Sequence, residues 1–210
     1  MGHGSAAGET GTMGCVVKDV AGDRFGLTCN HVIADLNKGI RGKTEVWCPG
    51  SAKGGTSSDR VGVLHDYVNL AFGGAYNDID AAIAKPNLPS DLDPTVDGIG
   101  SINGWTSSIS FGDKVKKSGD STGVTAGKYR FKINGVISYS GGQKALFRDL
   151  LGIVGTSTNS DFAMQGDSGA VVLNDNDKVV GQVISVTTGM DLTLAAPIEP
   201  ILQQLKVEPV

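Results

Sequence analysis

Short apolar runs separated by glycine, asparagine and aspartate recur along the chain, a pattern typical of β-strands joined by tight turns. The first clear pattern predicts a hairpin with strands over Thr12–Val20 and Phe25–Cys29, turning at Ala21–Asp23. Further strands are expected over Glu45–Cys48, Arg60–Tyr67, Asp80–Ala84, Lys114–Ser118, Gly127–Ile133, Gly135–Ser140, Gly152–Gly155, Ala170–Leu173 and Lys178–Val186. The pattern therefore predicts an all-β protein.

A connection rich in proline and aspartate, Lys85–Thr95, divides the predicted strands into two comparable halves. We expect an N-terminal domain over residues 10–90 and a C-terminal domain over residues 91–196. The clear helical signal runs from Pro197 to about Leu205, where a proline suits the first turn and apolar residues recur on one side. Residues 197–210 are therefore expected to form a C-terminal helix and tail.

Composition and charge exclude several classes of function. The 210 residues include 18 basic and 22 acidic ones and give a formal charge of -4, without a basic stripe for nucleic acid. No apolar run approaches the roughly 20 residues that a membrane helix needs. The first five residues lack the apolar core of a signal peptide, so we interpret them as a remnant of expression and expect a cytoplasmic protein.

Three cysteines, Cys15, Cys29 and Cys48, cannot all pair within one chain, and none has the spacing of a metal-binding pair. Cys15 and Cys29 lie nearly opposite each other across the predicted hairpin, where a disulfide could form under oxidising conditions. The alternative is that the thiols are buried and reduced. We expect no metal and no cofactor.

The run Gln165-Gly166-Asp167-Ser168-Gly169, followed by an apolar strand, has the form of a nucleophile loop. A serine hydroxyl needs a neighbouring base, and the oxyanion formed by its attack needs fixed N–H donors. Gly166 can adopt backbone angles closed to other residues. We therefore predict Ser168 as the nucleophile and the N–H groups of Gly166 and Ser168 as the oxyanion hole.

A base and an acid are found in two further motifs. His31 ends the second strand of the predicted hairpin, and imidazole is the natural base near neutral pH. Asp80 leads directly into an apolar strand, where a buried carboxylate could orient the imidazole, although Asp78 competes for the role. His65 has no serine or acid motif beside it and is interpreted as structural.

Cys-Asn-His-Val, Asp-Ala-Ala-Ile and Gly-Asp-Ser-Gly, in this order, resemble the motifs of chymotrypsin-like (trypsin-fold) serine peptidases. Over nearly its whole length the chain is similar to bacterial trypsin-like peptidases related to the plant narrow-leaf group. The segments that carry this likeness are Gly11–Gly14, Asn30–Val32, Asp80–Ala84, Lys117–Gly127 and Ala196–Ile198.

The resemblance implies two antiparallel six-stranded β-barrels with the active site between them. It also implies an endopeptidase that cleaves protein or peptide substrates through an acyl-enzyme, with limited processing of one dedicated protein as the expected role. Two alternatives stay open. The chain could be a latent peptide-binding module that needs a partner for activation, or an esterase acting on small substrates.

Two departures from the family pattern concern activation and specificity. Nothing near Gly11 offers the usual new N-terminus that pairs with the aspartate before the nucleophile, so Asp167 must have another partner or none. The position of the specificity-pocket base falls on Phe162, or on Asp161 after a shift of one residue. Phe162 would favour apolar side chains, and Asp161 would favour Lys or Arg. The resemblance also assigns substrate binding to Gln165, Ser185, Val186 and Thr187.

Overall fold

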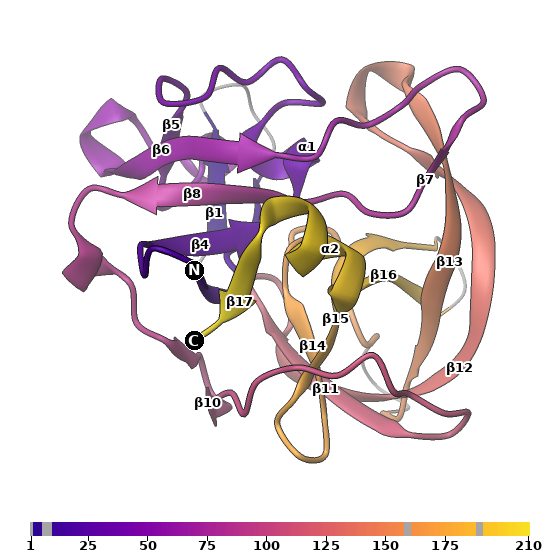
Figure 1. The fold of residues 1–210 in the computed structure, drawn as a ribbon. Coiled ribbons are helices and arrows are strands. Elements are labelled where there is room, and N and C mark those ends of the chain that lie inside the picture. The colour runs from indigo at the N-terminus through magenta and orange to yellow at the C-terminus, as the bar shows by residue number, and fades with distance from the viewer. Residues whose placement is uncertain (1, 6–9, 158–160, 188–190) are drawn as a thin grey trace.

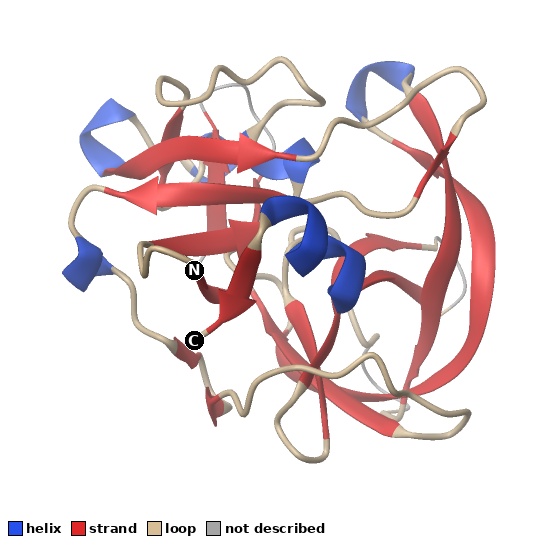
Figure 2. Cartoon of the chain, viewed as in Figure 1, coloured by secondary structure: helices blue, strands red, loops and turns tan. Residues whose placement is uncertain are grey.

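The computed structural model describes residues 2–5, 10–157, 161–187 and 191–210, and these are mostly β-structure with a short helix near the C-terminal end (Figure 1 and Figure 2). The strands form two large sheets and one two-stranded pair. The expected β-rich architecture is therefore confirmed.

The first sheet has eight strands. In spatial order they are β17 (Val207–Pro209), β3 (Cys15–Asp19), β4 (Arg24–Thr28), β8 (Ala82–Pro86), β6 (Arg60–Tyr67), β5 (Glu45–Trp47), β1 (Gly2–Ser5) and β2 (Thr10–Thr12). The β3–β4 hairpin turns where expected, because the Asp19 carboxylate accepts the N–H groups of Ala21 and Asp23, and Gly22 takes a φ of 89°. Sequence reasoning missed β1, which it had interpreted as a remnant.

The second sheet has seven strands: β12 (Gly123–Ser138), β11 (Lys114–Gly119), β14 (Val171–Asn174), β15 (Val179–Val186), β16 (Thr193–Pro197), β13 (Lys144–Gly155) and β7 (Tyr76–Asn77). Because β12 also pairs with β13, six of these strands close into a ring, and β7 joins β13 as an additional parallel strand. The long β12–β13 hairpin is prominent in Figure 1. Two strands were expected where β12 runs as one, with a register shift between Ile133 and Gly135.

The C-terminal helix α2 (Ile198–Leu205) forms as predicted and buries Ile198, Ile201, Leu202 and Leu205. Lys206, with a φ of 57°, ends the helix and turns the chain into β17, which pairs with β3 of the first sheet. The last residues therefore cross from the second sheet back to the first. Among the described residues, no helix is long and apolar enough to cross a membrane.

The remaining elements are short. They are α1 (Asn30–Ile33), the 3₁₀ helices η1 (Ser51–Lys53), η2 (Ser57–Asp59), η3 (Pro89–Asp91) and η4 (Ser140–Gly142), and the pair β9 (Thr95–Val96) and β10 (Gly100–Ser101). One buried apolar cluster draws residues from both large sheets, such as Leu27 and Phe147, and a second lies within the second sheet around Phe162. The two halves of the chain thus share a core. Cys15, Cys29 and Cys48 are all thiols.

Candidate active site

His31 lies in the single turn of α1, just beyond the end of β4, and its side chain is buried. We expected it at the strand end itself; the chain instead passes Cys29 in an extended conformation before turning. The neighbouring Asn30 fixes this turn, because its buried amide donates to the Val68 carbonyl at 2.7 Å and to Asn37 Oδ1 at 2.8 Å. The imidazole is therefore held on a rigid segment of the first sheet.

Asp80 meets His31 through both carboxylate oxygens. Oδ2 lies 2.6 Å from His31 Nδ1, and Oδ1 accepts the His31 backbone N–H at 3.2 Å. Burial alone would raise the pKa of Asp80, but the charge and hydrogen bonds of His31 and the hydroxyl of Tyr139 together hold that pKa below its usual value. Asp78, the competing acid, instead pairs on the surface with Arg148 at 2.5 Å.

Ser168 and His31 line the same cavity, which has a volume of about 680 Å³. The backbone N–H groups of Gly166 and Ser168 have no acceptor within the described part of the chain, so both are available to an incoming oxygen. Gly166 has a φ of 101°, and a Cβ there would lie 2.2 Å from Ser121 Oγ. Only glycine fits this position without distortion.

Thr12 of β2 ties the nucleophile loop to the first sheet. Its N–H donates to the Ser168 carbonyl at 2.7 Å, and its hydroxyl donates to the Gly166 carbonyl at 3.0 Å. Thr28 of β4 donates to the Thr12 carbonyl at 2.8 Å. One residue thus sets the spacing between the strand that leads to His31 and the loop that carries Ser168.

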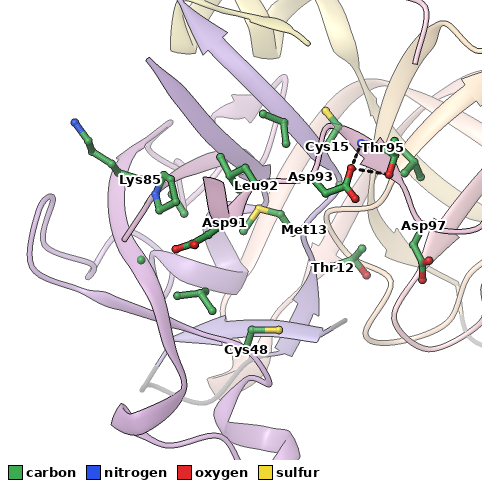
Figure 3. Close-up of a pocket in the computed structure, with 18 of the residues that line it drawn as sticks. Thr12, Met13, Cys15, Cys48, Lys85, Asp91, Leu92, Asp93, Thr95 and Asp97 are labelled. Carbon is green, nitrogen blue, oxygen red and sulfur yellow. Dashed lines mark hydrogen bonds between the residues drawn. The ribbon is translucent and has the colours of Figure 1, made fainter. Parts of the chain in front are cut away.

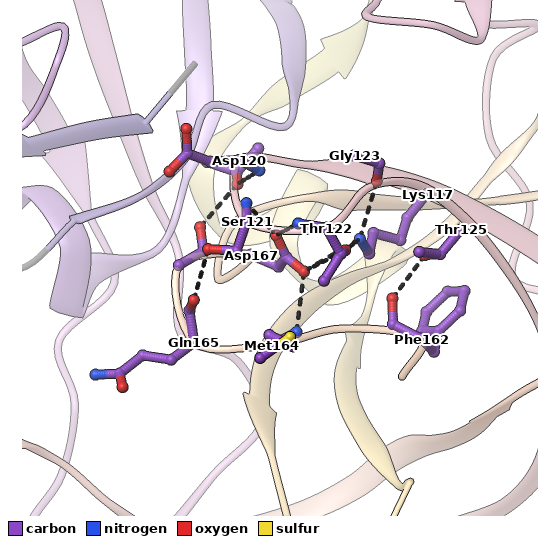
Figure 4. A network of polar contacts seen from close by, with 12 residues as sticks. Lys117, Asp120, Ser121, Thr122, Gly123, Thr125, Phe162, Met164, Gln165 and Asp167 are labelled. Carbon is purple, nitrogen blue, oxygen red and sulfur yellow. Dashed lines mark hydrogen bonds and ion pairs between the residues drawn. The ribbon is translucent and has the colours of Figure 1, made fainter. Parts of the chain in front are cut away.

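Asp167 has an internal partner, Lys117 of β11, whose Nζ lies 3.1 Å from Oδ2 (Figure 4). Both side chains are fully buried. Thr122 connects the pair, since its hydroxyl accepts from Lys117 and donates to Asp167 at 2.7 Å. The N–H groups of Ser121 and Met164 donate to the same carboxylate. The partner of Asp167 is therefore the side-chain ammonium of Lys117, within the same chain.

The pKa values of this pair follow from burial and bonding. Burial would raise the pKa of Asp167, but the bonds from Met164, Thr122 and Ser121 and the charge of Lys117 together lower it. For Lys117, burial outweighs the carboxylate and lowers the pKa below its ordinary value. The loop is therefore anchored by a carboxylate that stays ionised well into the acid range.

Only some of the residues predicted to bind substrate line the cavity that contains Ser168. Gln165, Ser185 and Val186 line the cavity of Ser168, whereas Asp161, Phe162 and Thr187 are not among its lining residues. The Phe162 side chain is fully buried in the core of the second sheet, and Asp161 is exposed. Neither side chain is among the described residues that line this cavity, and the choice of pocket base stays a prediction.

Several residues that hold the segments of the site were not predicted as functional, although Thr12 and Lys117 lie in segments that carry the family resemblance. Asp191 accepts the N–H groups of Gly155 and Phe162 at 2.8 and 3.1 Å, so it joins the end of β13 to the segment that precedes the nucleophile loop. Thr12, Lys117 and Tyr139 act through partners far away in the sequence. Such contacts depend on the fold and have no local pattern.

A second cavity, of about 660 Å³, lies between the first sheet and the connection that follows β8 (Figure 3). It contains the thiols of Cys15 and Cys48 but neither His31 nor Ser168. Burial raises the pKa of Cys15 to about 12 and also raises that of Cys48, so neither thiol is ionised near neutral pH. This cavity therefore lacks an activated nucleophile.

One group of side chains has the composition of a metal site. Ligand-type atoms of Cys29, His31 and Asp80 lie within 4.8 Å of one another. They are engaged with other partners, because His31 and Asp80 bond each other and Cys29 Sγ lies 3.4 Å from the Val183 carbonyl. The arrangement fits an oriented imidazole, and we assign no metal to it.

Comparisons with known proteins support the same fold. No protein-family model and no curated protein matches the sequence. Solved serine proteases match over almost the full chain.

Three of these solved structures have the following similarity to the chain. Nocardiopsis protease has a TM-score of 0.64 at 19% identity, over 99% of this chain and 95% of that one. Cellulomonas bogoriensis chymotrypsin has a TM-score of 0.61 at 18% identity, over 100% and 95%. A glutamic-acid-specific serine protease that uses a histidine triad in substrate binding has a TM-score of 0.66 at 19% identity, over 100% and 97%. The chain has the fold of chymotrypsin-like serine proteases.

Proposed function

We propose that this protein is a serine endopeptidase that acts through an acyl-enzyme. The observation that carries the proposal is the buried His31–Asp80 pair at 2.6 Å, whose imidazole lines the same cavity as Ser168, together with two unbonded N–H groups of the described nucleophile loop. In this reaction His31 takes the Ser168 proton as the hydroxyl attacks the scissile carbonyl. The N–H groups of Gly166 and Ser168 hold the oxyanion, His31 then protonates the leaving amine, and water releases the acyl group.

The anchored loop favours an active enzyme over a latent module. Latent forms of this chemistry require a loop that is ordered only after an event such as cleavage or partner binding. Here Asp167 already has its cation, Lys117, together with donors from Ser121, Thr122 and Met164. The loop therefore needs no further charge to hold its shape.

The cavity favours substrates with uncharged side chains beside the scissile bond. Its walls near Ser168 include Met164, Gln165, Ser185 and Val186. A lysine at its rim, Lys53, is paired with Asp120. His31 is the single histidine in the described lining, so the histidine triad named for the glutamate-specific protease has no counterpart there. We further propose limited processing of a particular protein. Wholesale degradation of a cell extract on a gel would contradict that part.

Covalent labelling with a fluorophosphonate probe tests the activity without assuming a substrate. We expect the native chain to label and both Ser168→Ala and His31→Ala to stay unlabelled. Ser138→Ala, which removes another serine from the same cavity, serves as the matched control and should still label. No labelling of well-folded native protein would overturn the proposal.

A further inference from the structure

Asp80 has a third partner besides the two groups of His31. The Tyr139 hydroxyl donates to Asp80 Oδ2 at 2.8 Å, and this is the same oxygen that His31 Nδ1 approaches at 2.6 Å. Asp80 is fully buried, and Tyr139 is 9% exposed. The hydroxyl and the imidazole therefore share one carboxylate oxygen away from solvent, where each hydrogen bond has a large electrostatic effect.

Tyr139 comes from the other half of the molecule. It follows the last residue of β12, and its N–H closes the hairpin by donating to the Gln143 carbonyl at 2.9 Å. Its ring packs against the imidazole of His31, with centroids 5.4 Å apart, and meets Phe72 edge-on at 6.5 Å. The tip of the β12–β13 hairpin thus reaches over the acid and the base, which both belong to the first half.

The same hairpin holds the segment that leads to Asp80. β7 pairs with β13 in parallel, and the Asn77 amide donates to the Leu146 carbonyl at 3.0 Å. Arg148 of β13 pairs with Asp78 at 2.5 Å. Together with the bond from Tyr139 to Asp80, these contacts fix residues 77, 78 and 80 to one hairpin.

We propose that Tyr139 is a positioning residue for the triad, carried by the β12–β13 hairpin, which orients the Asp80 carboxylate toward His31 across the boundary between the two halves. This inference rests on the proposed function. It assigns to Tyr139 no contact with the reacting atoms. Its effect passes through Asp80, whose oxygen is fixed by a donor on each side and so cannot rotate away from the imidazole.

Tyr139→Phe removes the hydroxyl and keeps the ring packing. Asp80 Oδ2 then loses the hydroxyl donor and keeps its contact with His31. The negative charge of the carboxylate is less stabilised, so it holds the protonated imidazole more strongly. We expect the acid limb of the fluorophosphonate labelling rate to move up by about half a pH unit, and the plateau rate to fall about fivefold, both smaller than the full contribution of one hydrogen bond to a charged group. Among the described residues, the other ionisable groups in this region include the Cys29 thiol, the surface pair Asp78–Arg148 and, in the cavity, Lys53 with its partner Asp120. None of them is changed.

Tyr67→Phe is the matched control. Its hydroxyl donates to the Asn37 carbonyl at 3.0 Å, its side chain is 8% exposed, and it bonds no member of the triad. A merely structural role for Tyr139 would make the two variants alike: both would lose stability, and neither would change the pH profile. Equal profiles for the native chain and Tyr139→Phe would overturn the proposal.

A readout independent of activity separates this inference from the proposed function. The proton between His31 Nδ1 and Asp80 can be followed by NMR, and we expect its resonance to shift in Tyr139→Phe and to stay in place in Tyr67→Phe. An unchanged resonance would overturn the positioning role even if the enzyme labels normally. If the native chain fails to label, the peptidase proposal falls, while a shifted resonance still shows that Tyr139 orients Asp80.

Discussion

Replacing Lys117 with methionine tests whether the internal ammonium anchors the nucleophile loop. The substitution keeps most of the side-chain volume and leaves the fully buried Asp167 without its cation. Breaking a buried ion pair by removing one partner costs about 3–5 kcal/mol. Ser121, Thr122 and Met164 still donate hydrogen bonds to the carboxylate. We therefore expect the free energy of unfolding to fall by an amount near the lower end of this range, about 3 kcal/mol at pH 7.

Urea unfolding followed by tryptophan fluorescence measures this loss. Lys116→Met is the control, because Lys116 neighbours Lys117 on β11 and also forms an ion pair, with Asp177 at 2.6 Å. In contrast to the buried pair, both of these side chains are partly exposed to solvent, by 36% and 42%. An exposed pair contributes at most about 1 kcal/mol. The labelling rate should fall about tenfold in Lys117→Met, equivalent to ~1.4 kcal/mol of barrier, and stay near the native value in the control.

The pH dependence gives a second test of the same pair. The pKa of Asp167 is lowered in the folded protein. The ionised carboxylate therefore stabilises the fold at pH values above the ordinary pKa of an aspartate, and this stabilisation is lost as the pH falls through the lowered pKa. Without Lys117 the pKa of Asp167 should rise, because protonation then relieves an unpaired buried charge. The stability gap between the native chain and Lys117→Met should therefore narrow below about pH 4. Equal losses in the two lysine variants, or a gap that widens in acid, would refute the reasoning.

Two further substitutions test the oxyanion hole and the choice of acid. Gly166→Ala, at a φ of 101° and with its new methyl 2.2 Å from Ser121 Oγ, should slow labelling about a hundredfold. Gly22→Ala, at a φ of 89° in open space, should lower stability only, and equal labelling in both would contradict the prediction. Asp80→Asn should reduce labelling about 10³-fold or more, whereas Asp78→Asn should cost less than tenfold; the reverse order would make Asp78 the acid.

Local patterns were enough to predict some elements of the fold. The β3–β4 hairpin follows from two apolar runs around a short polar turn, and α2 follows from a proline start and one apolar side. The β12–β13 hairpin was predicted only in part. Most side chains of β12 are exposed or partly buried, and glycines interrupt this strand, so the hydrophobic signal within it is weak.

The chemical residues were easier to find than the residues that hold them. A nucleophile, a base and an acid each need a particular residue type in a particular local setting, and the sequence offers a candidate for each. Lys117 and Tyr139 gave no such signal. A lysine in a strand is usually exposed, and the bond from Tyr139 to Asp80 spans 59 positions. Only the closed second sheet brings these side chains to their partners.

The placement of His31, Asp80 and Ser168 relative to one another depends on contacts that cross between the two halves of the chain. β7 leaves the first half to pair with β13, β17 returns from the C-terminal end to pair with β3, and Thr12 bonds the nucleophile loop directly. Because His31 and Asp80 lie in one half and Ser168 in the other, a shift between the halves would separate His31 from Ser168. Each crossing contact resists that shift at a different place. Thr12 acts at the loop of Ser168, the β12–β13 hairpin acts at Asp80, and β17 acts at β3, the strand beside β4. The geometry of the proposed active site is therefore a property of the interface between the halves, and substitutions there should alter the labelling rate more than their cost in stability suggests.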